Sequence, residues 1–291
     1  MSHPIAASEL VLNPDGSIYH CKLLPENLAD FIFLVGDPGR VPIVSSFFDQ
    51  VDFKVQNREI VTHTGLKNGK RVSVISTGMG TDNIDIVLSE LDAVANIDLK
   101  TKQIKSAHKQ LTFIRLGTSG SLQEDIPPDS YIMSTHGLGF DGLVHYYANS
   151  DTLTNHPFIE KFITDLQWNE RLPRPYLAEA DTELLNKAVN LGFYSGVTAT
   201  ATGFFGPQGR VLRLGIKDVT LNEKLSRFRF ENMRITNFEM ETSGIYGLSK
   251  LMGHRALTIN CVVANRFTGQ FSKDYHKAMQ QLIARVMEGF L

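Results

Sequence analysis

The sequence predicts a single α/β domain with a central mixed β-sheet flanked by helices. Short β-branched apolar segments alternate with amphipathic helical patterns, and several of the apolar segments run into glycine-rich stretches. No repeat, low-complexity linker or charge block divides the chain. Ligands of such sheets bind beyond the carboxyl ends of strands, so we expect a functional site at the glycine-rich stretches.

Hydrophobic periodicity assigns the individual elements. The predicted strands are 31–35, 71–77, 111–116, 131–135, 194–202 and 256–264. The predicted helices, which carry apolar residues at helical spacing, are 82–96, 241–252 and 273–290. The first three strands each run into glycines, which we expect to form loops. We assign residues 1–17 to an N-terminal extension and residues 18–291 to the one domain.

Composition disfavours several classes of function. Hydrophobic residues make up 42% and charged residues 21% of the chain, as in ordinary soluble globular proteins. A net charge of -2 provides no overall basic field for nucleic acid or an anionic membrane. Cys21 and Cys261 are too isolated for a disulfide framework or zinc site, and the N-terminus lacks a signal-peptide pattern. We expect a cytoplasmic protein that binds no metal, nucleic acid or membrane.

Three arginines, Arg40, Arg58 and Arg115, adjoin predicted strand ends or turns. A guanidinium forms bidentate bonds to phosphate oxygens, and successive backbone amides in a glycine turn bind anions. Thr118 adds a hydroxyl donor beside Arg115. Each arginine alone is more often an ordinary surface residue. Together they favour an oxyanion site, since Arg115 ends an otherwise apolar strand and needs an anionic partner there.

The sequence lacks the motifs that bind the phosphates of a nucleoside triphosphate or a dinucleotide. No glycine loop is closed by Lys-Ser or Lys-Thr, and no GxGxxG fingerprint occurs. We therefore predict that the protein uses no organic cofactor.

Two carboxylates, Glu239 and Glu241, bracket Met240 where a predicted strand meets a helix. One carboxylate can hold a vicinal diol of a sugar and favour positive charge on the adjacent ring. Acidic residues are also common in first helical turns, where they offset the helix dipole. Both interpretations stay open from this segment alone.

Phe204, Gln208 and Arg210 place an aromatic ring, a carboxamide and a guanidinium within one short segment. A carboxamide can donate and accept at once, matching the N3–H and carbonyl edge of a uracil-like base. Arg210 can neutralise an anionic carbonyl oxygen, and Phe204 can stack on the ring. A Gly-Pro loop with apolar rings and a solvated arginine is an equally good interpretation.

Five segments gain meaning when they are read together: GDPGR (36–40), STGMG (76–80), RLGTSG (115–120), FFGPQGR (204–210) and NFEMET (237–242). As a set they resemble the nucleoside phosphorylase-I family, and within it the uridine phosphorylases. The resemblance extends over residues 18–290 and implies phosphorolysis of uridine, deoxyuridine or thymidine. It also implies a homo-oligomer, commonly a hexamer built from dimers, with active sites shared across a dimer interface.

The resemblance also implies a role for each matching residue. The residues implied for phosphate are Gly36, Arg40, Arg115, Thr118 and, from a neighbouring subunit, Arg58. Those implied for ribose are Met240, Glu241, Thr118 and, across the interface, His20. Those implied for the base are Phe204, Gln208, Arg210 and Gly120. Of these, Arg210, Gln208 and Glu241 would act in catalysis.

Three features depart from the family pattern. Pro207 separates Gly206 from Gln208, where the family places the glycine directly before the glutamine. Residues 98–110 are longer than expected for a turn. Asn83 replaces a serine found near a monovalent cation in several relatives, and we predict no cation there.

Three alternatives share parts of this pattern. A purine nucleoside phosphorylase would need an acidic residue near Asn265 to protonate the purine. A hydrolase would have no need for three arginines around an anion. A catalytically silent nucleoside-binding protein on the same fold would bind uridine without releasing uracil.

Overall fold

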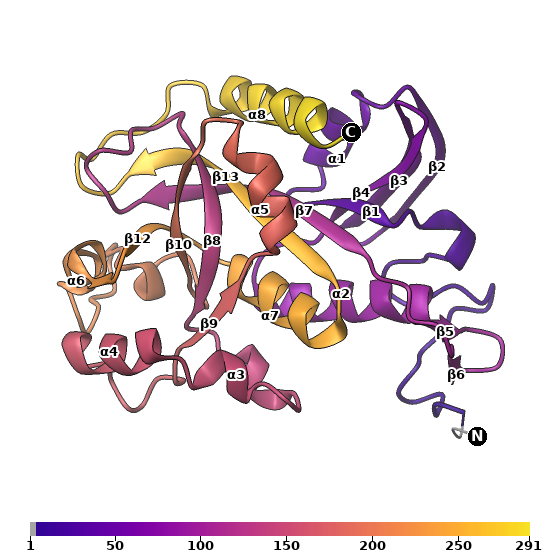
Figure 1. Cartoon of the computed structure of the whole chain (residues 1–291), viewed down its shortest axis with the longest axis horizontal. Helices are drawn as coiled ribbons and strands as arrows, with labels where there is room; N and C mark the ends of the chain where they lie inside the picture. Colours follow the sequence, from indigo (N-terminus) through magenta and orange to yellow (C-terminus); the bar gives the residue numbers. More distant parts are fainter. Residues whose placement is uncertain (1–3) are drawn as a thin grey trace.

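Within residues 4–291, which the computed structural model describes, eleven strands form one mixed sheet (Figure 1). The strands are β1 (Phe31–Val35), β2 (Gln50–Asn57), β3 (Ile60–Lys67), β4 (Lys70–Ser76), β7 (Thr112–Ser121), β8 (Tyr131–Gly139), β9 (Tyr176–Glu179), β10 (Tyr194–Thr200), β11 (Arg229–Phe230), β12 (Met233–Glu239) and β13 (Arg255–Asn265). The predicted fold class, a mixed sheet flanked by helices, is confirmed.

The sheet has an open half and a closed half. Along its path the strands follow the order β11-β12-β10-β8-β13-β7-β1-β4-β3-β2. In the open half, β1 runs parallel to β4 and β7, while β2, β3 and β4 are antiparallel. In the other half, β12 also pairs with β7, so β7, β13, β8, β10 and β12 close into a ring.

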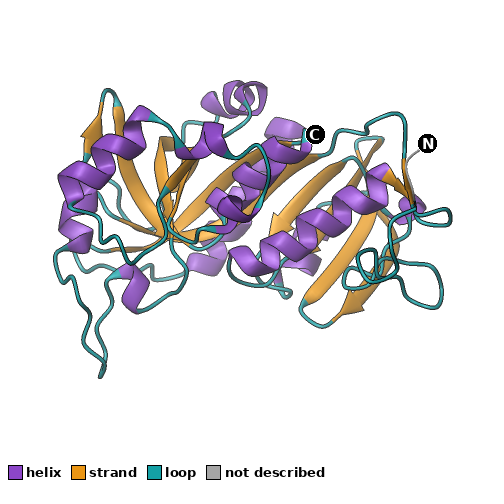
Figure 2. Cartoon of the chain, turned by 90° about the horizontal axis from the view of Figure 1, so that it is seen from below, coloured by secondary structure: helices purple, strands orange, loops and turns teal. Residues whose placement is uncertain are grey.

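Helices cover both faces of this sheet (Figures 1 and 2). Helices α2 and α7 pack against each other on one side, and α8 lies on the opposite side, where it contacts β13 and α5. The helices of the described residues are α1 (Arg40–Ser45), α2 (Thr81–Asn96), α3 (Asp151–Thr154), α4 (Pro157–Leu166), α5 (Thr182–Val189), α6 (Leu221–Arg227), α7 (Thr242–Met252) and α8 (Tyr275–Phe290). Short 3-10 turns occur at Pro25–Asn27, Leu143–Tyr146 and Gly206–Gln208.

Burial explains why these segments adopt these elements. β1 is apolar along its length because it lies inside the sheet with helices on both faces, and its residues 32–35 are fully buried. In α2, Ile84, Val87, Leu88 and Leu91 recur at helical spacing and point into the same core. The main apolar cluster therefore joins the open half of the sheet to α2, α7 and α8.

One expectation about the glycine stretches is wrong. The first two do form loops after β1 and β4, but Gly117 to Gly120 continue strand β7. The cause is local space: a side chain at residue 117 would lie 1.7 Å from Arg115 Nη1. Gly117 is needed because the Arg115 side chain folds back over it, rather than because the chain turns there.

The long segment 98–110 contains a small hairpin of its own. Strands β5 (Ile97–Asp98) and β6 (Gln103–Ile104) pair with each other, apart from the main sheet. The segment then returns along the carboxyl end of α2, where the Asn96 side chain bonds both the N–H and the carbonyl of Lys109. The additional residues thus cover a helix end.

The described part of the N-terminal extension packs onto the domain. Leu10 is buried in the main apolar cluster together with Ile18. Residues 1–3 lie outside the described part of the chain, and the boundary at residue 17 stays a prediction.

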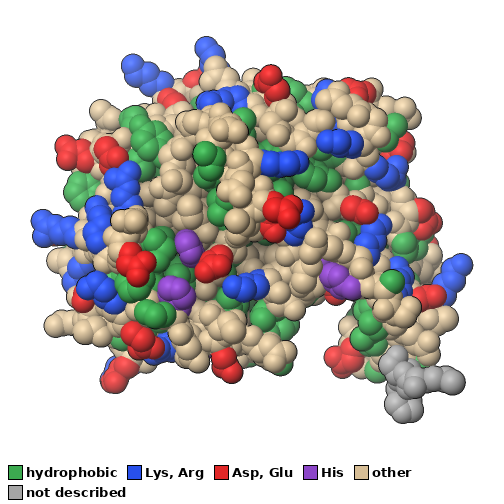
Figure 3. Space-filling view, in the orientation of Figure 1, with side chains coloured by type: hydrophobic (Ala, Val, Ile, Leu, Met, Phe, Trp, Pro, Cys, Tyr) green, Lys and Arg blue, Asp and Glu red, His purple; other side chains and the backbone are tan. Residues whose placement is uncertain are grey.

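Charges of both signs are interspersed on the face shown in Figure 3, as the net charge of -2 leads one to expect. Across residues 4–291, none of the helices combines the length and the apolar character required to cross a bilayer.

Candidate active site

A cavity of about 660 Å³ opens where β1, β4 and β7 meet the carboxyl ends of β10 and β12. Ten of the twelve predicted site residues line it: Gly36, Arg40, Arg115, Thr118, Gly120, Phe204, Gln208, Arg210, Met240 and Glu241. These side chains come from segments far apart in the sequence. Their convergence follows from the ring closure, which sets β12 antiparallel to the end of β7.

The cationic corner of the cavity contains Arg40 and Arg115. Arg40 follows the glycine turn after β1 and donates through Nη1 to the carbonyl of Leu116 at 3.0 Å. Desolvation and the nearby charge of Arg115 lower the pKa of Arg40. Two guanidinium groups of like charge thus face one space. An anion bound between them relieves this repulsion.

The two carboxylates of the 239–241 segment have different functions in the fold. Glu239 accepts hydrogen bonds from the backbone N–H groups of Glu241 and Thr242 at the start of α7. The helix-terminus interpretation therefore applies to Glu239. Glu241 instead turns to the cavity, where it accepts from Gly80 N at 2.7 Å and from Arg115 Nη2.

Glu239 lies close to Glu241 and Arg115 in a buried setting. Desolvation raises the pKa of Glu239, and the charge of Glu241 adds to the rise, while Arg115 opposes it at 3.5 Å. The corner therefore holds two carboxylates and two arginines. Of these two carboxylates, Glu241 is the one whose side chain is on the cavity wall and caps no helix, which suits it to bind a polar ligand.

The other end of the cavity is formed by Phe204, Gln208 and Arg210. Arg210 lies over the Phe204 ring, with its Cζ 3.7 Å from the ring centroid. Arg210 Nη1 donates to the buried Gln208 side chain at Oε1, at 2.6 Å. Desolvation, with a contribution from the charge of Arg266, lowers the pKa of Arg210 to about 10. This end combines a stacked cation with an oriented carboxamide.

The Gly-Pro-Gln departure is accommodated by a short 3-10 turn. Pro207 occupies the second position of Gly206–Gln208, where its missing N–H is not required. Gly209 then adopts a left-handed conformation with φ +68°, and Arg210 N donates to the Phe205 carbonyl at 2.9 Å. The turn sets Gln208 and Arg210 on the same side of the loop.

His20 and Arg58, the two residues assigned to a neighbouring subunit, do not line this cavity. The two lie on adjoining segments, since Asn57 Nδ2 donates to the His20 carbonyl at 2.9 Å. His20 Nδ1 is 2.6 Å from Glu90 Oε1, and Arg58 sits in the exposed turn between β2 and β3 with φ 52°. The structure describes one chain, so their interfacial roles stay predictions.

Several cavity residues were not predicted. Ser119, Glu59, Met79 and Phe271 line the cavity, and the Ser119 hydroxyl is buried with no partner among the described residues. Met79 and Ser119 fall inside quoted motifs, so the motifs signalled them. Glu59 and Phe271 carry no sequence signal, because they reach the cavity only through folding.

Asn265 occupies the position where a purine-specific enzyme needs an acidic residue. All of its side-chain hydrogen bonds are made within the fold. Its Nδ2 donates to the carbonyls of Gln123 and Ile126, each at 2.9 Å, and its Oδ1 accepts from the N–H groups of Phe267 and Thr268. The side chain is buried and fixes the loop after β13.

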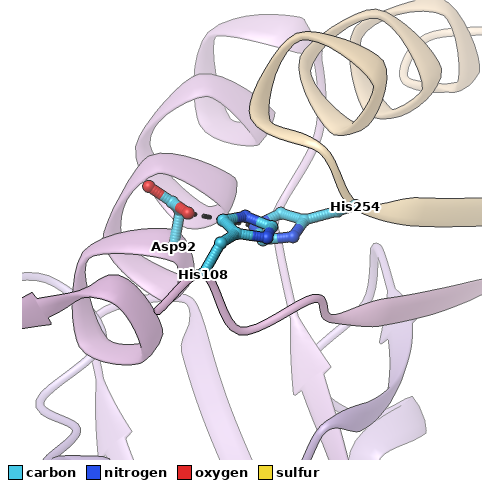
Figure 4. A group of neighbouring side chains, drawn as sticks. All are labelled: Asp92, His108 and His254. Carbon is cyan, nitrogen blue, oxygen red and sulfur yellow. Dashed lines mark hydrogen bonds and ion pairs between the residues drawn. The ribbon is translucent and has the colours of Figure 1, made fainter. Parts of the chain in front are cut away.

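A second group of ionisable side chains, Asp92, His108 and His254, lies at the opposite end of β7 and β13 (Figure 4). His254 Nδ1 accepts from Leu111 N at 3.2 Å, which places the ring proton on Nε2, facing Asp92 at 3.1 Å. A metal at Nε2 requires the other tautomer, in which the second nitrogen donates. These bonds favour a hydrogen-bonded clamp between a neutral imidazole and a carboxylate over a metal centre.

Comparisons with known proteins agree on the family. The family described as "Phosphorylase superfamily" matches residues 30–291. A uridine phosphorylase of Thermococcus kodakarensis is 29% identical over 283 residues, 95% of this chain and 88% of that protein. A DeoD-type purine nucleoside phosphorylase of Listeria monocytogenes is 27% identical over 252 residues, 86% of this chain and 88% of that protein.

A solved structure extends this agreement to the fold. It is that of a Trypanosoma brucei nucleoside phosphorylase, whose description states uridine phosphorylase activity. It superposes with a TM-score of 0.87 at 31% identity and covers 96% of this chain and 98% of that one. The similarity therefore includes both halves of the sheet.

Proposed function

Because the chain belongs to the phosphorylase superfamily, and its relatives are nucleoside phosphorylases, we propose that it is a uridine phosphorylase. It uses inorganic phosphate to convert uridine, and also deoxyuridine or thymidine, into the free base and the sugar 1-phosphate. The observation that carries the proposal is one cavity with an arginine corner at one end and the Gln208–Arg210 pair at the other.

Phosphate occupies the arginine corner in this proposal. Arg40 and Arg115 provide charge-assisted donors, and Thr118 and the turn at Gly36 add neutral ones. The anion lies beneath C1′ of the nucleoside and attacks it as the base departs. The C1′–N1 bond breaks while a C1′–O bond to phosphate forms, so no protein nucleophile takes part.

Glu241 and Met240 hold the ribose between the two ends. The Glu241 carboxylate accepts from the 2′ and 3′ hydroxyls and favours the positive charge that develops on the ring. Its bond to Arg115 couples the two sites, because a single cation contacts both the sugar-binding carboxylate and phosphate. Charge stabilisation and positioning supply the rate enhancement.

Gln208 and Arg210 hold the departing pyrimidine. Arg210 occupies one lone pair of Gln208 Oε1, which leaves the second lone pair for the N3–H of the base and the amide N–H₂ for a carbonyl. Arg210 stabilises the negative charge on the leaving base, while Phe204 offers its ring for stacking.

The proposal includes a homo-oligomer. His20 and Arg58 lie together outside their own cavity, which fits contribution of both to the cavity of a neighbouring subunit. We propose that His20 reaches the ribose 5′ hydroxyl there and that Arg58 adds a third cation for phosphate.

A purine nucleoside phosphorylase is the second candidate, since a purine-specific relative matches most of the chain. It shares the phosphate and ribose residues, so only the base end separates the two. The engaged amide of Asn265 supports the pyrimidine alternative, because it offers no acid to a purine N7.

The deciding experiment is a base-release assay with uridine, thymidine, inosine and adenosine, each with and without phosphate. We expect phosphate-dependent release of uracil and no release from the purine nucleosides. Release of hypoxanthine or adenine at a comparable rate would establish the purine alternative. Release without phosphate would indicate a hydrolase, and uridine binding without release would indicate a silent binding protein.

A further inference from the structure

Arg115 is oriented by an uncharged residue that no motif contains. Asn260 Oδ1 on β13 accepts from Arg115 Nη1 at 2.9 Å, and both side chains are buried. Asn260 pairs in register with Gly117 on β7. The missing side chain at residue 117 leaves the space in which the Arg115 guanidinium and the Asn260 amide meet.

A chain of buried polar groups fixes the orientation of the Asn260 amide. Asn260 Nδ2 lies 3.5 Å from Ser134 Oγ, which is 2.6 Å from Thr198 Oγ1, and Thr198 donates to Asn237 Oδ1 at 2.9 Å. The chain crosses β13, β8, β10 and β12 within the ring. Since a guanidinium has only donors, the amide oxygen must face Arg115 and the amide nitrogen must face Ser134.

We propose that Asn260 is a positioning residue for Arg115. Because its side chain is uncharged, it holds the guanidinium in place and keeps the affinity of the site for phosphate high. This inference rests on the proposed function. Arg115 already contacts the carboxylates Glu241 and Glu239. A neutral acceptor holds the guanidinium in place without cancelling more of its charge, so the corner keeps its attraction for a dianion.

The test is the pair of variants Asn260→Asp and Asn260→Ala. Asp keeps the size and the acceptor but adds a negative charge, and we expect the KM for phosphate to rise about tenfold or more. The KM for uridine should change much less. Ala removes the acceptor without adding charge, so its rise in phosphate KM should be smaller than that of Asp. Equal changes in both KM values would overturn the inference.

A matched control is Asn96→Asp, which makes the same amide-to-carboxyl change at a buried site at the end of α2. It should lower stability and leave the phosphate KM unchanged. A similar rise in phosphate KM in this control would assign the effect to general destabilisation and overturn the inference.

Phosphate-dependent thermal stabilisation separates this inference from the proposed function. If the wild-type chain gains Tm with inorganic phosphate but releases no base, the proposed function fails while the variants still test the inference. The gain should then be smallest in Asn260→Asp. If Asn260→Asp does not fold, Asn260→Ala decides: a selective loss of phosphate binding supports the inference, and unchanged binding overturns it.

Discussion

The adjacent strands β7 and β13 have a cluster of polar side chains at each end, and the two clusters differ in how completely their hydrogen bonds are satisfied. At their amino ends, His254 uses both ring nitrogens, toward Leu111 and Asp92, and Asp92 also accepts from Asn96. Toward their carboxyl ends, the Arg115 guanidinium, which folds back over Gly117, and the Ser119 hydroxyl, which has no partner within residues 4–291, face a cavity. The same pair of strands therefore supports a satisfied cluster at one end and an incomplete one at the other.

This difference indicates that the cluster at the amino ends serves stability and the cluster at the cavity serves function. A satisfied cluster stabilises the fold and gains nothing from a ligand, whereas an incomplete cluster leaves donors to be completed by one. Substitutions at the amino ends should therefore change the free energy of unfolding and not catalysis. Those at the cavity should change catalysis most.

The largest effect is expected for Arg115→Met. Loss of this cation removes a phosphate donor and leaves Glu239 and Glu241 without their partner, so kcat/KM should fall about 1,000-fold or more. Steady-state kinetics with uridine and phosphate measure it. Arg255→Met, at the amino end of β13, is the matched control and should keep its activity, because within residues 4–291 Arg255 forms ion pairs with Asp181 and Glu183 and none with a cavity residue.

Arg210→Ala should have the next largest effect. It should distinguish the function of the base-binding end of the cavity from that of the phosphate-binding end. We expect turnover of uridine to fall about 100- to 1,000-fold, because the leaving base loses its charge stabilisation. Phosphate should still raise the Tm, since Arg40 and Arg115 are untouched. Arg213→Ala, in the same loop but exposed, is the control. Near wild-type turnover in Arg210→Ala would contradict the assignment of the base end.

His254→Ala tests the amino end directly. Its fully enclosed imidazole bonds Leu111 and Asp92, so we expect the free energy of unfolding to fall by about 2 kcal/mol in urea denaturation. The kcat of the folded fraction should not change. The exposed His276→Ala serves as control. A selective loss of phosphate affinity in His254→Ala would show that the two ends are coupled.

The smallest effect is a dependence of stability on pH through Asp92. Desolvation alone would raise its pKa, but the hydrogen bonds from His254 and Asn96 outweigh it, and the pKa of Asp92 is lowered. A carboxylate whose pKa is lower in the folded state than in the unfolded state stabilises the fold at pH values above the unfolded pKa. This stabilisation is lost as the pH falls through the folded pKa.

Asp92→Asn should therefore cost about 1 kcal/mol at pH 7 and progressively less in acid. Urea unfolding of both proteins at several pH values measures it. A difference between wild type and variant that stays constant down to the lowest pH would contradict the assignment of this group.

The sequence predicted β1, β4, β7, β8, β10, β13, α2, α7 and α8 because burial controls these elements, but the predicted ranges omit β2, β3 and β9. The apolar stretch 31–35 is β1, and the helix predicted at 82–96 starts one residue earlier, at Thr81. The expected loop at residues 117–120 failed because glycine signals both a turn and a close approach. Only the position of the Arg115 side chain distinguishes these two uses of Gly117.

Sequence also located most cavity residues but could not locate their partners. Arg115 stands out because a charge inside an apolar strand is unusual, whereas Asn260 lies in a strand with no distinguishing pattern. Likewise Asp92, His108 and His254 come from segments far apart in the chain and share no motif. Such pairings depend on strand register, which hydrophobic periodicity alone does not fix.

The ring closure of β7 with β12 also determines where the sheet has a free edge. Its members are hydrogen-bonded around the ring, so among the strands of residues 4–291 the long one left with an unpaired side is β2, at the end of the open half. Along β2 the exposed positions are occupied by Gln50, Asp52, Lys54 and Gln56. Charged and polar side chains of this kind discourage another strand from adding there, which protects the fold from edge-to-edge aggregation.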